Sequence, residues 1–164
     1  MDIRGAAFYG LADAPAVEAF ESCAEGDALE VTLGGTLDPA SVKISAKAIL
    51  KKKGVVMAWP ARNDVAAVLL DVNGNDVLVT KERTPIVHMK VFSDFGTDPS
   101  AYRFVILKLG YLWPEMYSIA ADSLMLFTPG STCEVVERCV FGHIPRPVYP
   151  LDREMEWMPR VYEG

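Results

Sequence analysis

Two apolar segments separated by an Asn-Gly pair constrain the fold of this chain more than any other feature. Residues 65–72 read VAAVLLDV, residues 77–80 read VLVT, and Asn73-Gly74 lies between them. A two-residue type I′ turn needs positive φ at both central positions, which asparagine and glycine tolerate, so the pattern predicts a β-hairpin. Upstream, residues 42–50 alternate between apolar and polar side chains, which is the period of a half-exposed strand. The middle of the chain therefore predicts antiparallel β-structure.

Short apolar and helical patterns surround this hairpin. Further strands are expected at residues 6–9, 29–33, 104–107 and 123–127, and short helices after the N-cap Asp13, around 88–95 and over 114–121. The strand 104–107 is apolar at every position, which is typical of a strand buried on both faces. With 114–121 and 123–127 it would form a strand–helix–strand unit. The chain therefore predicts an α/β or α+β fold, with a mixed β-sheet, an antiparallel hairpin region and short covering helices in a single domain over residues 1–164.

Two glycine-containing pairs mark the ends of predicted strands. Gly34-Gly35 follows the strand 29–33. For this pair, a tight turn is a simpler interpretation than a phosphate-binding loop, because no G-x-G-x-x-G or Walker sequence is present. Pro129-Gly130 would stop the strand 123–127. We expect both pairs to be structural, as are Asn73 and Gly74 of the hairpin.

The charge balance argues against some classes of partner. The chain has 164 residues and a formal net charge of −6, which is unsuited to a nucleic-acid or anionic-membrane surface. Its only basic run, Lys51-Lys52-Lys53, is expected to be a solvated strand end. No apolar run is long enough to span a bilayer, and the three cysteines form no C-x-x-C pair. We therefore expect a cytoplasmic protein with reduced thiols and with no nucleic-acid or membrane partner.

Residues suited to hydrolytic chemistry are sparse. The two histidines, His88 and His143, stand 55 residues apart and outside any H-x-H or H-E-x-x-H pattern. They could meet in space with a carboxylate such as Asp94 or Glu115, but two ordinary hydrogen-bonded or exposed histidines are the simpler interpretation. No G-x-S-x-G sequence is present. We expect no catalytic residue and no metal site within this chain.

Two segments that follow predicted strands are candidates for binding. One is TKERTP (80–85), which contains Arg83 and Thr84, and the other is KLGYLWPE (108–115), which begins with Lys108. Binding loops often lie beyond strand ends, and α/β sheets bind ligands there. The alternatives are a solvated rim for the first segment and, for the second, a lysine whose apolar stem lies along the surface.

Four stretches of the chain occur in the order found in one enzyme family. They are EVTLGGTLDP (30–39), DVLVTKERTPIVHMKVFSDFGTDPSAYR (76–103), FVILKLGYLWPEMYSIAADSLMLFTPGST (104–132) and IPRPVYPLD (144–152). The combination of K-L-G-Y-L-x-P-E, T-P-G and R-P-x-x-P-L-D is more specific than any of its parts. On these motifs the chain resembles the C-terminal domain of the MlrC-like (microcystinase C) metallopeptidase family. Many members have an S-x-x-H-F-type sequence after the strand lysine, where this chain has L-G-Y-L-W.

The resemblance implies that the chemistry lies in another domain. Family members are longer, and their zinc ligands and catalytic glutamate belong to a larger N-terminal α/β domain whose motifs do not occur here. The resemblance therefore implies a non-catalytic domain that is inactive alone, with no cofactor in this chain and zinc in the other domain. Its expected partner is an MlrC-like catalytic domain, in cis or in trans. The residues that would face the cleft of that domain, where cations could bind a substrate carboxylate or an oxyanion, are Arg83, Thr84, His88, Lys108 and Tyr111.

Two other functions stay open on the sequence. The chain could be an independent ligand-binding or self-associating module that forms a homo-oligomer through apolar surface, since 51% of its residues are hydrophobic. It could also be a small stand-alone enzyme that uses Lys108 with His88 or His143. Bound metal and turnover by the isolated chain would indicate the enzyme, and its mass in solution would indicate self-association.

The proline-rich stretch 144–152 is expected to be extended. Each proline fixes φ, removes a backbone donor and pushes the residue before it towards extended conformations. We expect residues 144–164 to form a closing segment of the domain, with Tyr149 and Leu151 as anchors and Arg146 in an ion pair. The residues of this stretch that are expected to be structural are Arg146, Pro147 and Pro150.

Overall fold

The computed structural model describes residues 4–38, 41–128 and 135–159. The chain divides into two compact units, residues 1–124 and residues 125–164, which we describe separately. Pro129, Gly130 and Cys133 lie outside the described residues. Across the three described ranges, no helix combines the length and the apolar character that crossing a bilayer requires.

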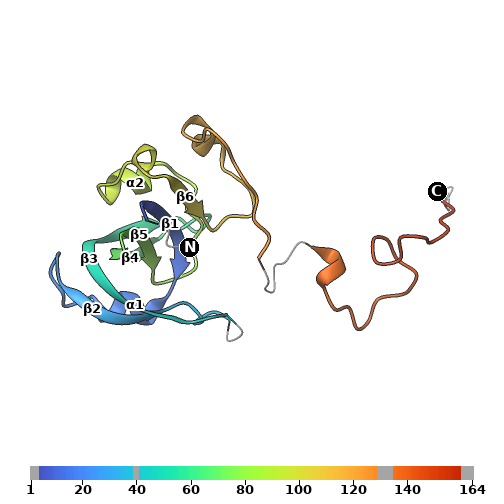
Figure 1. Ribbon diagram of the computed structural model, residues 1–164, viewed down its shortest axis with the longest axis horizontal. Helices are drawn as coiled ribbons and strands as arrows, with labels where there is room; N and C mark the ends of the chain where they lie inside the picture. The colour runs from blue at the N-terminus through green and yellow to red at the C-terminus, as the bar shows by residue number, and fades with distance from the viewer. Residues whose placement is uncertain (1–3, 39–40, 129–134, 160–164) are drawn as a thin grey trace. The chain divides into compact units, whose positions relative to one another are not determined.

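The first unit is built on one mixed sheet of six strands (Figure 1). The strands are β1 (Ala6–Ala12), β2 (Ala28–Leu33), β3 (Ile44–Met57), β4 (Asp64–Val72), β5 (Asn75–Thr80) and β6 (Phe104–Leu107), in the spatial order β2-β3-β4-β5-β1-β6. β1 runs parallel to β5 and β6, and the other neighbours are antiparallel. The helices are α1 (Ala14–Ala19), α2 (Lys90–Asp94) and the 3₁₀ turns η1 (Pro99–Ala101), η2 (Pro114–Ser118) and η3 (Val136–Arg138), the last of which belongs to the second unit. The predicted fold class is confirmed in its α+β form.

The β4–β5 hairpin forms as the Asn-Gly pair predicts. Asn73 and Gly74 have φ of 55° and 78°, and Val72 pairs with Asn75 across the turn. The backbone N–H of Gly74 donates to Asp71 Oδ1 at 2.8 Å. Because β4 and β5 lie in the middle of the sheet, this turn sets the register on which the remaining strands are built.

Two apolar cores lie on opposite faces of the sheet, with α2 on one side and α1 on the other (Figure 1). Along β4, Ala67 and Leu69 belong to the α2 side, whereas Val68 and Leu70 belong to the α1 side. This strand is buried on both faces because each face has its own helix. The residues of the helices and of their C-caps that enter the cores are Val91, Phe92 and Phe95 on the α2 side and Ala16, Val17 and Phe20 on the α1 side.

The lysine run lies inside β3 and not at a strand end, so that expectation is wrong. β3 continues to Met57, with a register shift against β4 between Leu50 and Lys52. Lys51 Nζ donates to both oxygens of Asp76 at 2.7 Å, and Lys53 Nζ donates to the carbonyls of Glu21 and Cys23. The lysines are accommodated because their long side chains reach fixed acceptors while the backbone stays in the ladder.

Asp76 is the centre of a buried polar network at the amino end of β5. Its carboxylate also accepts from Tyr102 Oη at 2.5 Å, while Tyr9 Oη shares a hydrogen bond of 2.7 Å with Thr97 Oγ1. Burial raises the pKa of Tyr9 to about 12 and also raises the pKa of Tyr102, whose hydroxyl then stays a donor to the carboxylate. The network thus holds the segment after α2 against the sheet.

The region from β6 to residue 127 differs from its prediction. Among the described strands β6 lies at the edge of the sheet and pairs only with β1, and Phe104 is 54% exposed, so the strand is not buried on both faces. The expected helix over 114–121 is the shorter 3₁₀ turn η2, and residues 123–127 are exposed and belong to no strand. No strand–helix–strand unit forms in this described region, because nothing pairs with the outer edge of β6.

Asp13 joins the ends of three elements. It is 1% exposed, and its Oδ1 accepts from the N–H of Ala16 at 3.2 Å, which makes it the predicted N-cap of α1. Its Oδ2 accepts from the N–H of Gly34 at 2.8 Å, and its own N–H donates to the carbonyl of Thr80 at 2.9 Å. Gly34 and Gly35 both have positive φ, as expected for a tight turn after β2. α1 ends near Phe20.

The second unit contains a loop closed by an ion pair. Arg146 Nε and Nη2 donate to the two carboxylate oxygens of Asp152 at 2.6 and 2.5 Å, and the N–H of Val148 donates to Oδ2 at 2.7 Å. Residues 144–152 therefore curve back on themselves and are not simply extended. Tyr149 is exposed and Leu151 is half-buried, and a closing role for residues 144–164 stays a prediction.

Replacing Asp13 by alanine should destabilise the first unit. The change removes the helix cap and leaves the N–H of Gly34 without its acceptor, which together should cost about 2–4 kcal/mol. Asp13→Asn keeps one acceptor oxygen and should lose less. Urea unfolding of both variants measures the effect, with Asp98→Ala as control, because exposed Asp98 caps only the short η1. Equal stability of Asp13→Ala and the parent chain would contradict this role.

The Arg146–Asp152 pair should give a carboxyl group that resists protonation. The guanidinium, followed by the N–H of Val148, lowers the pKa of Asp152 from 3.8 to about 2. Because the folded pKa is the lower one, the pair stabilises the loop above about pH 4 and stops doing so as the pH falls towards 2. Carboxyl-detected NMR titration of Arg146→Ala should show the pKa of Asp152 rising towards 3.8. Glu154→Ala, at an exposed position of the same unit, should leave it unchanged.

Candidate functional site

The strand register brings several loops to one edge of the sheet. β1, β5 and β6 are parallel, so the segments after Ala12, Thr80 and Leu107 leave from the same edge. β4 begins beside the end of β5, and the β3–β4 connection therefore lies at this edge as well. We call it the strand-end edge. Its chemistry-bearing residues are Trp59 and Arg62 from the β3–β4 connection, Arg83, Thr84 and His88 from the segment after β5, and Lys108, Tyr111, Trp113 and Glu115 from the segment after β6.

The backbone of Lys108 is held against β1. Its N–H donates to the carbonyl of Tyr9 at 3.1 Å, next to a register shift between Tyr9 and Leu11. Gly10, inside that shift, has φ of 105°, and a Cβ there would lie 3.1 Å from Lys108 Cβ. Glycine is thus needed for the close approach. The side chain of Lys108 is exposed, and among the described residues its ammonium has no hydrogen-bond or ion-pair partner.

Glu115 connects the two loops that flank β6 and α2. Its Oε1 lies 3.1 Å from His88 Nδ1, and its Oε2 accepts from the N–H of Met89 at 3.0 Å. The hydrogen bond from the Met89 N–H lowers the pKa of Glu115 most, and the hydrogen bond with His88 lowers it further. Of the two carboxylates expected as partners of a histidine, Glu115 therefore meets His88, whereas Asp94 pairs with Lys90. The contact with Glu115 uses Nδ1 and orients the imidazole ring. The other ring nitrogen, Nε2, does not take part in this contact.

His88 belongs to a cluster of aromatic rings. The Trp59 ring lies 6.4 Å from the His88 ring and 6.3 Å from the Trp113 ring, both in edge-on geometry, and Tyr111 stacks on Trp113 at 5.8 Å. The Arg62 guanidinium lies 5.8 Å from the Trp59 ring. We call Trp59, His88, Tyr111 and Trp113 the aromatic cluster. Trp59 and Arg62 were not anticipated, and the only signal for them is a tryptophan within the polar turn sequence W-P-A-R-N-D.

Arg83 and Thr84 differ in their access to a ligand. Arg83 is exposed, so a ligand can reach its guanidinium directly. Thr84 is 4% exposed, and its hydroxyl has no hydrogen-bond partner within the described residues. A ligand would reach Thr84 only if the segment after β5 opened. Of this predicted pair, the structure presents only the arginine at the surface.

The strand-end edge is suited to binding a ligand. Its cations can hold a carboxylate or an oxyanion, and its aromatic rings can pack on an apolar or cationic side chain. No three His, Cys, Asp or Glu side chains within the described ranges are placed to hold a metal ion, so this part of the chain does not fit a zinc site on its own. No hydrogen bond between described residues links Lys108 to either histidine, and His143 belongs to the second unit.

Glu115 should control the order of the segment before α2. Glu115→Ala removes the acceptor of the Met89 N–H and the partner of His88, so exchange of the Met89 amide hydrogen should become several-fold faster. Glu115→Gln keeps an acceptor oxygen and should have a smaller effect. Hydrogen exchange followed by NMR measures both variants against Glu137→Ala in the second unit. Unchanged exchange in Glu115→Ala would show that the contact does not order this segment.

Comparison with known proteins places this fold in a family. The chain matches the model of the MlrC C-terminus family over residues 1–143, whereas no curated protein matches it. A crystal structure from Mesorhizobium sp. BNC1, of a protein assigned as a metallopeptidase, is similar with a TM-score of 0.72 and 18% sequence identity. The similarity covers 95% of this chain and 33% of that one, so this chain spans about a third of the length of that protein. Because the family model covers far more than half of the sequence, the chain belongs to the MlrC C-terminus family, as its motifs predicted.

Proposed function

We propose that this chain is the non-catalytic C-terminal domain of an MlrC-like zinc metallopeptidase or amidohydrolase. The observation that carries the proposal is the family match over residues 1–143. Two further facts support it. The similar protein assigned as a metallopeptidase is about three times as long, and the described residues of this chain offer no set of three metal donors. The catalytic domain, in cis or in trans, would supply the zinc and the catalytic glutamate.

In this proposal the strand-end edge completes the substrate cleft of the catalytic domain. Lys108 and Arg83 extend exposed cationic groups after β6 and β5, the strands on either side of β1, and Arg62 adds a third. Such groups bind a carboxylate of a peptide, or stabilise the negative charge that develops on a carbonyl oxygen during hydrolysis. The aromatic cluster offers a surface for a substrate side chain. A cytoplasmic location, expected from the cysteine content, belongs to the same proposal.

A second candidate is an independent binding module that self-associates. It is favoured by β6, whose outer edge pairs with no strand of the described residues and whose Phe104 and Ile106 are both exposed. Exposed apolar edge strands pair readily with other chains. The mass of the chain in solution distinguishes the two candidates, because a stable homodimer without a catalytic partner would favour the module.

The role of Lys108 can be tested in the joined enzyme. The isolated chain should neither bind stoichiometric zinc nor hydrolyse a peptide. Its complex with the family's N-terminal domain should bind zinc and hydrolyse peptide. In that complex, Lys108→Ala should lower kcat/KM roughly tenfold to hundredfold if the ammonium stabilises an oxyanion or a substrate carboxylate. Lys47→Ala, which removes an exposed lysine from β3, serves as the matched control.

Two results would count against this proposal. Unchanged kinetics of Lys108→Ala in the joined enzyme would remove Lys108 from the cleft while leaving the domain assignment intact. Zinc binding with turnover by the isolated chain would contradict the non-catalytic assignment itself. Metal analysis and a peptidase assay on the same preparation separate the two outcomes.

A further inference from the structure

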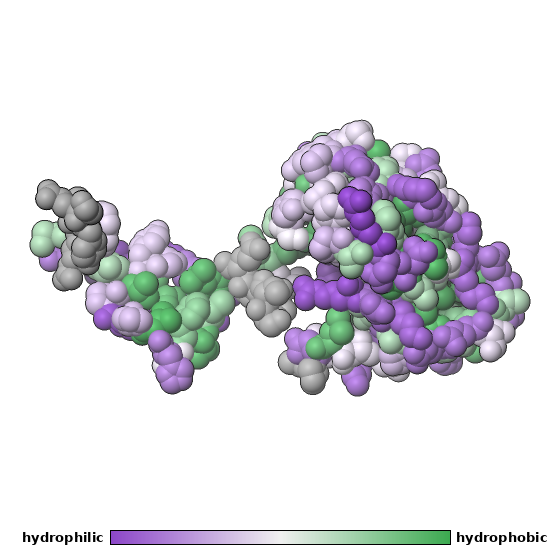
Figure 2. Space-filling model, turned by 180° about the vertical axis from the view of Figure 1, so that it is seen from behind, coloured by the Kyte–Doolittle hydropathy of each residue, from purple (hydrophilic) through white to green (hydrophobic). Residues whose placement is uncertain are grey.

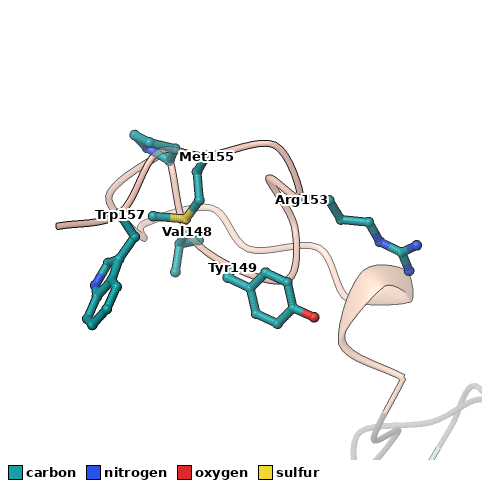
Figure 3. Close-up of a pocket in the computed structure, with 6 residues that line it drawn as sticks. Val148, Tyr149, Arg153, Met155 and Trp157 are labelled. Atoms are coloured by element: carbon teal, nitrogen blue, oxygen red, sulfur yellow. The ribbon is translucent and has the colours of Figure 1, made fainter. Parts of the chain in front are cut away.

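Each unit of the chain contains an open pocket, and the two pockets differ in the charged groups that they offer. The pocket of the second unit has a volume of about 520 Å³, and Figure 2 shows hydrophobic side chains at the surface of this unit. Figure 3 shows Val148 and Met155 close together in this pocket. The cation among its described lining residues, Arg153, already donates to Glu137 Oε1 at 3.0 Å. This pocket therefore offers no uncommitted charge that would select a ligand.

The pocket of the first unit lies where three parts of the fold meet, and we call it the β1-end pocket. They are the end of β1 with the start of α1, the β2–β3 connection, and the residue that follows β5. The contacts of Asp13 hold these parts together. Its volume of about 480 Å³ falls in the range of small-molecule sites, about 300–1,000 Å³. The lining includes Ala12, Pro15, Gly35, Leu37, Lys43 and Lys81.

Much of the lining of the β1-end pocket is apolar. Ala12, Pro15 and Leu37 contribute apolar surface, and Leu37 is 60% exposed. The hydroxyl of Thr36, another lining residue, donates to the carbonyl of Ala12 at 3.2 Å, which ties the β2–β3 connection to the end of β1. Covering an exposed leucine with the apolar part of a ligand is favourable. The lining is therefore suited to a ligand with an apolar body.

The turn after β2 positions the side chain of Lys43. Gly35 has φ of 70°, and a Cβ at this position would lie 2.6 Å from Lys43 Cγ and 3.0 Å from Lys43 Cε. The stem of the lysine thus lies directly against the glycine backbone, a path that a side chain at position 35 would block. Among the described residues the ammonium of Lys43 has no hydrogen-bond or ion-pair partner. The turn therefore places an uncommitted positive charge at the pocket.

The second cation of the β1-end pocket is already balanced by carboxylates. Lys81 Nζ lies 2.9 Å from Glu18 Oε1 and 3.6 Å from Glu21 Oε1. These two glutamates hold the ammonium in place, and they would repel a ligand that carries more than one negative charge. The charges at the pocket therefore favour a ligand with a single negative charge, placed beside Lys43.

We propose that the β1-end pocket binds a small monocarboxylic acid with a short apolar chain, such as an N-acylated amino acid. Its carboxylate pairs with the ammonium of Lys43, which acts as a compact point charge, and its apolar chain packs on Leu37 and Pro15. The pocket lies beyond the carboxyl ends of the parallel strands β1 and β5, where α/β sheets commonly bind ligands. This assignment stands apart from the proposed function, because it needs only residues of the first unit.

NMR titration of the full chain tests this site with three probes. N-acetyl-leucine should shift the amide signals of Gly35, Thr36 and Lys81 until they saturate. N-acetyl-leucinamide keeps the apolar body but lacks the carboxylate, so it should bind at least tenfold more weakly. Inorganic phosphate carries more charge and no apolar body, so it should also bind at least tenfold more weakly.

A matched pair of lysine variants assigns the carboxylate contact. Lys43→Met keeps the apolar stem and removes the charge at an exposed position, so the chain should stay folded. It should weaken binding of N-acetyl-leucine roughly tenfold and leave binding of the amide unchanged. Lys47→Met, which removes another exposed lysine from the same end of the β3 strand, should leave both unchanged.

The outcomes that overturn this site leave the proposed function untouched. The site is refuted if N-acetyl-leucine gives no saturable shift at the lining amides, or if the amide or phosphate binds as tightly as the acid. Unchanged binding in Lys43→Met removes the lysine–carboxylate contact on which the proposal is built. Zinc-dependent turnover of the joined enzyme is measured separately, so its failure would leave the pocket assignment standing.

Discussion

The first unit depends on buried Asp13, which joins the start of α1 and the turn after β2 to the ends of β1 and β5. One oxygen caps α1, the other binds the turn at Gly34, and the backbone N–H joins β1 to β5 at Thr80. α1 has six residues, too few to be stable alone, so it exists because it is capped and because Val17 and Phe20 pack on the sheet. A buried carboxylate is tolerated only with such donors, which makes the three contacts interdependent.

The parallel pairing of β1 with β5 and β6 gives this fold its candidate site. Parallel neighbours end at one edge, so Lys108 and Arg83 leave the sheet on the same side, and the β3–β4 connection adds Trp59 there. Glu115 then orients His88 across two loops. The result is a surface of cations and aromatic rings without a nucleophile–base pair among the described residues. The chain belongs to the MlrC C-terminus family, and this surface of its first unit is suited to binding a ligand.

Local sequence patterns correctly predicted the elements that are fixed by the backbone preferences and short-range contacts of neighbouring residues. The β4–β5 hairpin follows from the positive φ that Asn73 and Gly74 tolerate, and the N-cap follows from the short carboxylate of Asp13 before Pro15. The predictions that failed concern partners far away in the chain. The apolar β6 was expected to be buried, but it lies at the edge of the sheet. The lysine run was expected at a strand end, but β4 pairs with β3 on both sides of it.

The sequence by itself determined the mixed sheet with covering helices, the central hairpin, the family and the two loops in which Lys108, Arg83 and His88 lie. Each of these follows from short-range backbone preferences or from motifs contiguous in the chain. Only the tertiary structure decided that His88 meets Glu115, that Trp59 and Arg62 join the same edge, and that Thr84 is buried. These contacts depend on strand order and register, which bring together residues 26 to 29 positions apart, and no local pattern encodes that pairing.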